Sequence, residues 1–487
     1  MRERLSVLFF LFVTALVVSY PLSPDFLGPG ADREVYRYIG MVVRHGGMPY
    51  LDAFDNKPPV MFLITALVHE FGPWGIWLAE SLAIAGGAFF LFRIAEEQKT
   101  PIVGMFLALW LILLVRTPLV AEGGGLTRGF CPLLYLGGAW VLRGSSRWRF
   151  AIAGVVVGLL IELQPEEILP FVPFVGIAWM ESPDRRRNLM KIGVGVLAVV
   201  APITIWLAVR SALGSFWETF AFDRVWVGAA RGDLASRWWL LVTRLWDLEL
   251  LFPSLFALLL AGIALARSAR HRWLIGAVLT VVLQLVAIRV LRRGYGHYFQ
   301  PLVPLVLLLV LFSLESLVNR WRTFALSLFL LSAALPAGRS LSDAWDTLLS
   351  PKGVYASVVR DPWRQILEPY RGQRGSLYVM RRQGALALYT DFDIIAPTRW
   401  IYTLGWERRP PGREMREILD GIERFRTRYI YDFTTVRPFS SALQEVWEAH
   451  LKAHYRVRSL LPEGARLWER LPSEKLRGET AADLNRG

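Results

Sequence analysis

The sequence is poor in cysteine, in lysine and in charge. Its 487 residues include a single cysteine, Cys131, which excludes an internal disulfide, a zinc cluster held by cysteines and an iron–sulfur site. Only six of the 55 basic residues are lysines, a bias that we attribute to a GC-rich genome. Charged residues make up only 20% of the chain. A soluble protein of this length would expose far more charge, so that class is excluded as well.

Apolar and aromatic residues take the place of the missing charge. Hydrophobic residues make up 54% of the chain, and it holds 20 Trp and 28 Phe, which excludes a disordered protein. The formal net charge is +14, but the basic residues come as short clusters between apolar runs. Such clusters are typical of membrane topology signals rather than of a nucleic-acid-binding face. We therefore expect a membrane protein that binds no nucleic acid.

The apolar runs predict about eleven membrane-spanning helices, with an uncertainty of about two. The first run, residues 5–22, lacks a small-residue cleavage site, so we interpret it as a retained helix rather than a signal peptide. Each further run is close to the roughly 20 residues that cross a bilayer. These runs start near Trp74, Pro101, Gly129, Phe150, Leu169, Ile192, Leu250, Trp273, Pro301 and Thr323.

The basic clusters predict the orientation of these spans. They fall on every second connection, which predicts that those connections are cytoplasmic. With an odd number of spans, the N-terminus is then inside and the C-terminus outside. The clusters are Arg2/Arg4, Arg93/Lys99, Arg143/Arg147/Arg149, Arg185 to Arg187 with Lys191, Arg267/Arg270/Arg272 and Arg320/Arg322.

The character of the chain changes near Pro336, after which no segment could span a membrane. We therefore predict a membrane domain over residues 1–336 and a tail over residues 337–487. The tail contains short apolar runs that predict strands, and segments with helical spacing between and after them. Strands that alternate with helices indicate a small α/β domain. The predicted strands are residues 376–380 and 429–433, and the predicted helices are residues 384–389, 415–425 and 442–454.

Three connections that we predict to face outward carry the informative charges. The first loop, residues 23–59, has helical spacing from Arg33 to Arg44 and is too long for a simple turn. A functional loop and a solvated loop whose acids only cap helices are both compatible with this pattern. Its charged residues of interest are Asp32, Glu34, Asp52, Asp55 and Lys57.

The second loop, residues 116–128, places Glu122 ahead of three glycines. Glycines allow a close backbone approach to a ligand, but they also make a flexible turn. The third loop, residues 289–301, holds Arg292 and Arg293 on the side where topology gives no reason for basic residues. Two adjacent arginines suit an anionic headgroup such as a phosphate, and the alternative is anchoring at the membrane interface. They are followed by Tyr295, His297, Tyr298 and Gln300.

Acids in one outward loop and cations in another can act together on a charged lipid. Transfer of a group from a lipid phosphate to a hydroxyl requires a carboxylate that accepts the proton of the acceptor. It also requires cations that stabilise the leaving phosphate. The pattern therefore favours a transfer reaction, but it does not identify the substrate.

These residues resemble a known superfamily. The segment GADREVYRYIGMVVRHGGMPYLDAFDNKPPVMFLI is similar to the first extracytoplasmic loop of integral-membrane glycosyltransferases of the GT-C type, which include protein O-mannosyltransferases and the lipid A aminoarabinose transferase. GYGHYFQPLVPLV resembles a later loop of that family. SLYVMRRQGALALYTDFDIIAPTRW resembles the tail of its bacterial members. The resemblance thus covers most of the chain, and the first loop carries its most specific motif.

The resemblance implies an inverting glycosyltransferase in the bacterial cytoplasmic membrane. It would move one sugar from a polyprenyl-phosphate donor to a hydroxyl of an envelope protein, lipid or glycan on the outer side. Asp32 would be the catalytic base, and Lys57, Arg292 and Arg293 would bind the donor phosphate, with His297 and Tyr298 lining the same pocket. The remaining substrate-binding candidates are Glu34, Tyr36, Asp55, Glu122 and Gln300.

The chain departs from the family pattern at two acidic positions. Many members have an Asp-Glu pair where this chain has Asp32 followed by Arg33, with the next acid at Glu34. Members also often carry Thr-Glu in the second loop, where this chain has Thr127-Arg128 and its acid earlier, at Glu122. No cofactor is required by this chemistry. A divalent metal ion is possible, although the sequence shows no convincing ligand cluster.

Two other function classes remain open from the sequence. A transporter or flippase for a lipid-linked sugar would place charges at mid-membrane and often shows two related halves. Here the acids lie in loops, and no internal repeat is found. A non-catalytic scaffold for envelope assembly would not need the acids of the motif. A nearer alternative is an enzyme that transfers a whole oligosaccharide or uses diphosphate-linked donors.

Overall fold

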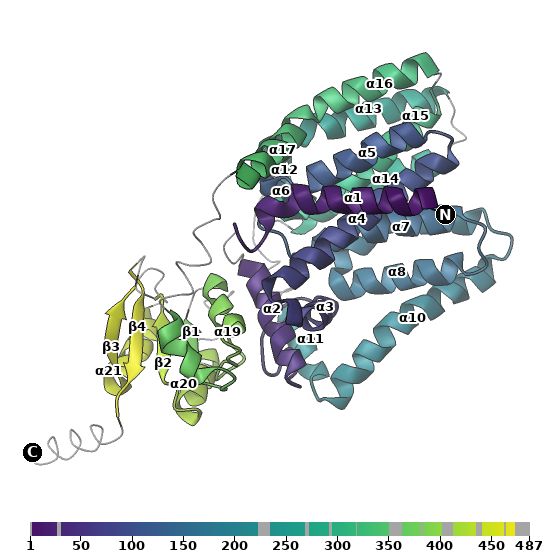
Figure 1. The fold of residues 1–487 in the computed structure, drawn as a ribbon. Helices are drawn as coiled ribbons and strands as arrows, with labels where there is room; N and C mark the ends of the chain where they lie inside the picture. Colours follow the sequence, from purple (N-terminus) through teal and green to yellow (C-terminus); the bar gives the residue numbers. More distant parts are fainter. Residues whose placement is uncertain are drawn as a thin grey trace, which may run out of the picture.

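The computed structural model describes most of the chain. The described residues are 2–26, 31–222, 234–267, 272–291, 295–317, 319–349, 363–380, 383–401, 413–434, 441–461 and 464–472. They form a helical bundle and, beside it, a small domain that contains a sheet (Figure 1).

Every one of the eleven predicted spans contains a helix of the bundle. Among the described residues, five helical segments are long and apolar enough to cross a membrane, and up to seven qualify if each bent pair counts as one span. The count of eleven therefore stays a prediction. The helices are α1 (Arg2–Ser19), α4 (Pro73–Glu97), α5 (Pro101–Val115), α7 (Cys131–Arg143), α8 (Arg149–Leu163), α9 (Val172–Met180), α10 (Arg185–Val209), α13 (Leu251–Arg267), α14 (Arg272–Leu291), α15 (Leu302–Glu315) and α16 (Asn319–Ser332).

Burial separates central helices from peripheral ones. All residues of the most apolar 18-residue stretch of the α15 span are buried, whereas only 11% of the corresponding stretch of the α10 span is buried. Large apolar side chains of α10, such as Leu197 and Ile205, are about three-fifths exposed (62% and 60%). Contiguous apolar surface of this kind is unfavourable in water and stable against lipid. This burial pattern fits a multi-pass membrane protein.

Helices α8 and α10 approach each other closely because both carry glycine at the crossing. A Cβ atom added to Gly154 would lie 2.9 Å from the Cα of Gly195 and 2.2 Å from the carbonyl oxygen of Ile192. Gly158 lies one turn later on α8. Small residues at such spacing let membrane helices pack backbone to backbone.

The remaining helices lie in the connections. The first loop contains α2 (Ala31–Arg44) and leads into α3 (Val60–Leu67), so the predicted helix from Arg33 to Arg44 is confirmed. The second loop contains the short α6 (Pro118–Ala121). Three further helices are α11 (Leu213–Phe222), α12 (Leu234–Asp247) and α17 (Ala334–Leu349). The predicted boundary between residues 336 and 337 lies inside α17, and the division into domains stays a prediction.

The tail folds around a four-stranded mixed sheet in the order β1-β2-β4-β3. Strands β1 (Leu377–Met380) and β2 (Tyr429–Asp432) are parallel, with Leu377 opposite Tyr429. The two predicted strands are therefore confirmed. Strands β3 (Tyr455–Leu460) and β4 (Arg466–Arg470) form an antiparallel hairpin that the sequence reading did not include. The tail helices are α19 (Ala387–Asp391), α20 (Arg413–Arg424) and α21 (Ser441–His454).

The tail packs against the first loop. The amide of Ala396 donates a hydrogen bond of 2.9 Å to the hydroxyl of Tyr38 on α2. The rings of Phe54 and Trp400, both nearly fully buried, lie 4.7 Å apart. These contacts place the tail at the same end of the bundle as the first loop (Figure 1).

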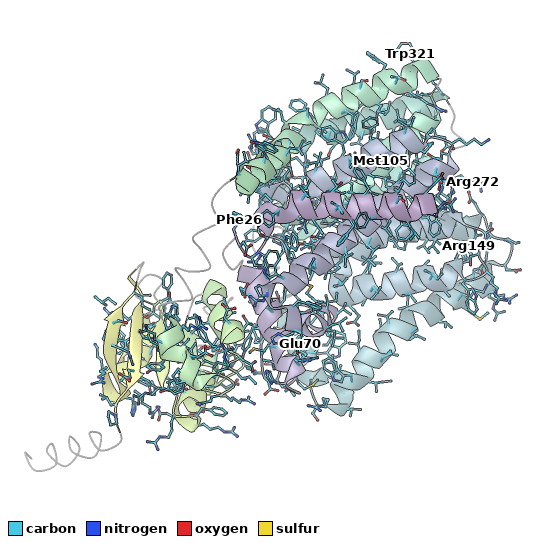
Figure 2. The ribbon with its side chains drawn as sticks, viewed as in Figure 1. Phe26, Glu70, Met105, Arg149, Arg272 and Trp321 are labelled. Atoms are coloured by element: carbon cyan, nitrogen blue, oxygen red, sulfur yellow. The ribbon has the colours of Figure 1, made fainter. Side chains whose placement is uncertain are left out.

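Residues that we predict to be cytoplasmic lie at the other end of the bundle. Figure 2 shows Arg149 and Arg272 at the end away from the tail, and Figure 1 shows the N-terminus at that same end. The arrangement agrees with a topology in which the basic clusters and the tail lie on opposite sides. Which of the two sides is cytoplasmic stays a prediction.

Candidate active site

Asp32 lies in the first turn of α2 and is half-buried. Its carboxylate has no hydrogen bond or ion pair to any residue in the described part of the chain. The positive end of the helix dipole favours a negative charge at this position. A carboxylate in this state can accept a proton or a hydrogen bond from a bound molecule.

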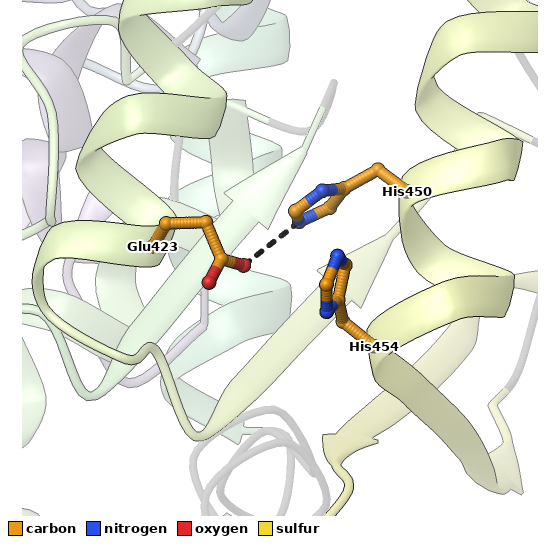
Figure 3. A group of neighbouring side chains, drawn as sticks. All are labelled: Glu423, His450 and His454. Atoms are coloured by element: carbon orange, nitrogen blue, oxygen red, sulfur yellow. Dashed lines mark ion pairs between the residues drawn. The ribbon is translucent and has the colours of Figure 1, made fainter. Parts of the chain in front are cut away.

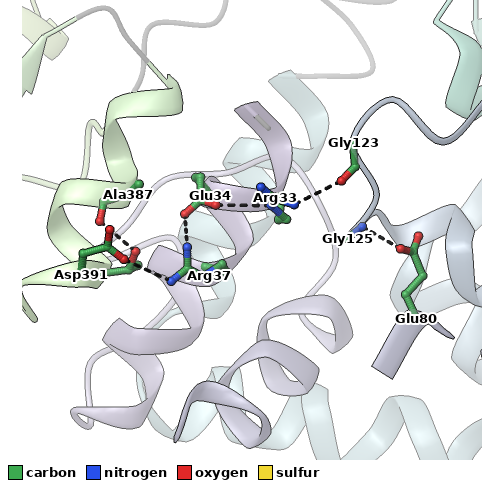
Figure 4. A network of polar contacts seen from close by, with 9 residues as sticks. Arg33, Glu34, Arg37, Glu80, Gly123, Gly125, Ala387 and Asp391 are labelled. Carbon is green, nitrogen blue, oxygen red and sulfur yellow. Dashed lines mark hydrogen bonds and ion pairs between the residues drawn. The ribbon is translucent and has the colours of Figure 1, made fainter. Parts of the chain in front are cut away.

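The neighbouring charges of α2, by contrast, are paired with one another. Both oxygens of Glu34, which is 1% exposed, face guanidinium groups: Oε2 lies 2.5 Å from Arg37 and Oε1 lies 3.4 Å from Arg33. Arg33 also donates a 3.2 Å hydrogen bond to the carbonyl of Gly123 in the second loop. Arg37 reaches Asp391 of the tail at 3.7 Å. We call these five residues the paired network (Figure 4).

The paired network explains why the second loop is rich in glycine. Gly123, Gly124 and Gly125 all have positive φ values, which side chains other than glycine rarely adopt. A Cβ atom on Gly125 would lie 2.8 Å from the Cγ of Arg33, and its amide donates a 2.8 Å hydrogen bond to Glu80. Glu80 in turn forms a buried 2.6 Å ion pair with Arg116. The glycines thus let the second loop pass close to α2.

The predicted substrate residue Glu34 is therefore held by two arginines and is not free to contact a sugar. Tyr36 is also buried and lies in a negative environment. Burial raises the pKa of its hydroxyl well above the usual value, and the charges of Asp32 and Asp55 raise it further. Asp55 is itself 4% exposed. Tyr36 and Asp55 are therefore buried, whereas Asp32 stays half-buried.

Lys57 contributes a cation to the same loop. Its carbonyl accepts a 2.7 Å hydrogen bond from the hydroxyl of Tyr50, which fixes the backbone ahead of Pro58 and Pro59. The Lys57 side chain is half-buried, and its ammonium group has no ion pair within the described ranges. It is therefore available to an anionic ligand.

The second and third loops meet through Glu122 and His297. The Nδ1 atom of His297 lies 2.5 Å from Oε2 of Glu122, and the amide of Gly296 donates to Oε1 of the same carboxylate. Burial alone would raise the pKa of Glu122, but the hydrogen bonds from His297 and Gly296 lower it. No other hydrogen bond of the His297 ring is found among the described residues. The ring is thus oriented by Glu122 and keeps Nε2 for another partner.

Tyr298 and Gln300 lie next to this pair and are almost fully buried. The guanidinium of Arg128 sits over the ring of Tyr298, 3.9 Å from its centroid, in cation–π contact. Neither amide atom of the Gln300 side chain has a hydrogen-bond partner among the described residues. A buried amide of this kind is costly unless a ligand or water satisfies it.

Arg128 was not among the predicted site residues. It is buried and pairs with Glu167 at 2.8 Å and with Glu166 at 3.0 Å. Glu167 also accepts a 2.8 Å hydrogen bond from Tyr135. A signal was present in the sequence, because an arginine at the end of the second loop and two adjacent acids in a short turn suit each other in charge.

The first, second and third loops approach one another at these residues. Asp32 is close enough to raise the pKa of both Tyr36 and His297, and the pKa of Tyr36 is also shifted by Tyr298 and Arg128. The structure therefore brings Asp32 and Tyr36 of the first loop near His297 and Tyr298 of the third. We call Asp32, Lys57 and His297 the open cluster, because each keeps a polar atom without a partner in the described chain. Arg292 and Arg293 lie outside the described residues.

The described residues of these loops do not form a set of metal ligands. Within the described residues, a group of three acidic, histidine or cysteine side chains close enough for one ion occurs in the tail but not among these loops. The open cluster offers a carboxylate, an ammonium group and an imidazole nitrogen.

The fold is shared with solved membrane-protein structures. Two similar solved structures are of ArnT from Cupriavidus metallidurans, each 14% identical to this chain. The structure bound to undecaprenyl phosphate matches 97% of this chain and 98% of its own with a TM-score of 0.59. The apo structure matches 97% and 99% with a TM-score of 0.62. No protein-family model and no curated protein matches the sequence.

Proposed function

We propose that this protein is an inverting glycosyltransferase. It moves a sugar from a polyprenyl-phosphate donor to a hydroxyl acceptor on the extracytoplasmic side of the bacterial cytoplasmic membrane. The observation that carries this proposal is the half-buried carboxylate of Asp32, which has no partner in the described chain. The shared fold supports it, since a relative with this fold was solved with undecaprenyl phosphate bound.

In this reaction Asp32 takes the proton of the acceptor hydroxyl. The acceptor oxygen then forms a bond to the anomeric carbon of the sugar, and the bond from that carbon to the phosphate oxygen breaks. A single displacement of this kind inverts the anomeric configuration. The leaving group is the polyprenyl phosphate, whose negative charge requires nearby donors and cations.

The remaining residues of the open cluster suit the donor phosphate. Lys57 supplies a positive charge that no described carboxylate neutralises. His297, held at Nδ1 by Glu122, can donate from Nε2 to a phosphate oxygen. The orienting carboxylate fixes the ring so that little reorganisation is needed when the donor binds. Arg292 and Arg293 stay predicted phosphate ligands, and a metal ion is not needed in this scheme.

The test is a transfer assay with the full-length protein in detergent. A panel of radiolabelled polyprenyl-phosphate sugars is incubated with envelope lipids, proteins and glycans as acceptors. We expect Asp32→Asn to lower transfer by about 10²–10⁴-fold, the usual contribution of a general base. Glu70→Gln is the matched control, because Glu70 is 66% exposed and, within the described chain, pairs only with the exposed Arg44. Asp32→Asn that transfers sugar as fast as this control would disprove the assignment.

Lys57→Met tests the phosphate role separately. Loss of one charge-assisted hydrogen bond costs about 1.5–3 kcal/mol, so the donor KM should rise about tenfold or more. The acceptor KM should stay unchanged. A change in the acceptor KM alone would show that Lys57 does not bind the donor. Export of a lipid-linked sugar without transfer, measured in vesicles, would instead identify a flippase.

A further inference from the structure

A second cluster of polar side chains lies in the tail, away from the loops. Glu423 is at the end of α20, and His450 and His454 are on the last turns of α21 (Figure 3). The two histidines are four residues apart, so they project from the same face of the helix. Their ring centroids are 4.8 Å apart.

The three side chains converge on one point. One oxygen of Glu423 and one ring nitrogen of each histidine all lie within 4.8 Å of one another. The Nε2 atom of His450 is 3.5 Å from Oε1 of Glu423. In a tetrahedral zinc site with bonds of about 2.0–2.1 Å, two ligand atoms are roughly 3.3 Å apart. The cluster is therefore close to the required spacing before any ion binds.

The converging atoms lack hydrogen bonds. Oε1 of Glu423, Nε2 of His450 and Nδ1 of His454 are buried and have no hydrogen-bond partner among the described residues. Three such atoms in one place are costly unless something satisfies them. A water molecule bonds to two or three of them only if their protonation states match, whereas a cation accepts lone pairs from all three.

The neighbouring Arg470 does not occupy the three converging atoms, so they can still bind an ion. Arg470 contacts Glu423 through the other carboxylate oxygen, Oε2, at 2.5 Å. The same guanidinium donates to the hydroxyl of Tyr455 at 3.2 Å, and that hydroxyl donates to the carbonyl of Thr427. Arg470 opposes a cation by its charge, but it also orients the carboxylate, as outer partners of metal ligands commonly do.

The donor types and their access to solvent suit metal binding as well. Burial would raise the pKa of Glu423, but Arg470 lowers it below its usual value. Glu423 is 41% exposed, which gives an ion access from solvent. A carboxylate and two imidazoles form a typical zinc ligand set.

We propose that Glu423, His450 and His454 bind one Zn²⁺ ion in the tail. Each ligand gives one atom, and water fills the fourth position. The ion joins the end of α20 to the end of α21 and so fastens the two helices beside the sheet. The proposal does not depend on the proposed glycosyl transfer, because the site shares no residue with the open cluster.

Metal binding by the full-length protein tests this inference. The protein, carrying an affinity tag without histidine, is treated with EDTA, dialysed and titrated with Zn²⁺ against a chromophoric chelator. His450→Phe keeps an aromatic ring beside Trp447 but removes the ligand atom, and His454→Gln is the second variant. Lys452→Ala, on an exposed position of the same helix, and His69→Ala, in the membrane domain, are the matched controls.

We expect both ligand variants to bind one Zn²⁺ per chain fewer than the wild type, or to bind that ion at least about tenfold more weakly. Both controls should bind as the wild type does. Co²⁺ in place of Zn²⁺ should give visible absorption bands of a four-coordinate site, which the two variants lose. A wild-type protein that binds no Zn²⁺, or equal binding by the wild type and either ligand variant, would overturn the proposal.

Discussion

Two acids of α2, Asp32 and Glu34, lie close together and differ in whether their carboxylates have partners. In the paired network, both oxygens of Glu34 face arginines, and those arginines reach the second loop and the tail. One residue before Arg33, the carboxylate of Asp32 has no partner in the described chain. The same short helix therefore carries one acid that is fully satisfied and another that is not.

This difference distinguishes charges that stabilise the fold from charges that can act on a ligand. A buried carboxylate that is paired with two guanidinium groups holds three segments together, and its removal leaves cations buried without a partner. An unpaired carboxylate holds nothing together, yet it is free to act on a ligand. We therefore expect substitutions in the paired network to change stability and substitutions in the open cluster to change activity.

The largest difference that we expect between the paired network and the open cluster is in how far a substitution lowers the free energy of unfolding. Glu34→Gln leaves Arg33 and Arg37 without a charged partner at Glu34 and should destabilise the protein by about 3 kcal/mol. Asp32→Asn breaks no contact within the described chain and should change stability by less than about 0.5 kcal/mol. Thermal unfolding in detergent, followed by tryptophan fluorescence, measures both. Equal destabilisation by the two variants would remove the distinction between the groups.

A smaller effect is expected at the junction of the second and third loops. Glu122→Gln keeps the shape of the side chain but weakens its hold on Nδ1 of His297. We expect kcat/KM to fall about tenfold, as for other outer partners of functional histidines, with little change in melting temperature. Glu70→Gln again serves as the control. Unchanged kinetics would show that His297 takes no part in donor binding.

The smallest effect is expected where the tail meets the first loop. Arg374 of the tail pairs with Asp52 at 2.9 Å, and Arg374 is 45% exposed. Exposed pairs of this kind contribute about 0–1 kcal/mol, so Arg374→Ala should shift the melting temperature only slightly. Trp400→Ala, which removes the buried partner of Phe54, is the contrasting variant and should destabilise the contact strongly. Limited proteolysis of the tail reports on both.

Local periodicity predicted much of the fold. Long apolar runs located all eleven helical segments, and the spacing between Arg33 and Arg44 located α2, because helices bury residues at a fixed interval. The strand pair β1 and β2 was also visible as short apolar runs. Strand β3 was not predicted, because most of its side chains are exposed. Its sequence, YRVRSL, shows only a weak alternation of apolar and polar residues.

Long-range pairing could not be predicted in the same way. Glu122 and His297 are 175 residues apart, and Arg128 and Glu167 are 39 residues apart. No local pattern encodes such contacts, and only the complementary charges hint at them. The tail cluster shows the same limit: the spacing of His450 and His454 is visible in the sequence, but Glu423 joins them only through the packing of α20 against α21. The sequence therefore did not predict this group of side chains.

A structure of the protein bound to undecaprenyl phosphate tests the central claim most directly. We predict that the phosphate lies among the loops, within hydrogen-bond distance of Lys57 and of Nε2 of His297. Asp32 should face the same space, on the side from which an acceptor hydroxyl can approach. A phosphate bound at the opposite end of the bundle, near Arg149 and Arg272, or one that contacts neither Lys57 nor His297, would contradict the proposed active site.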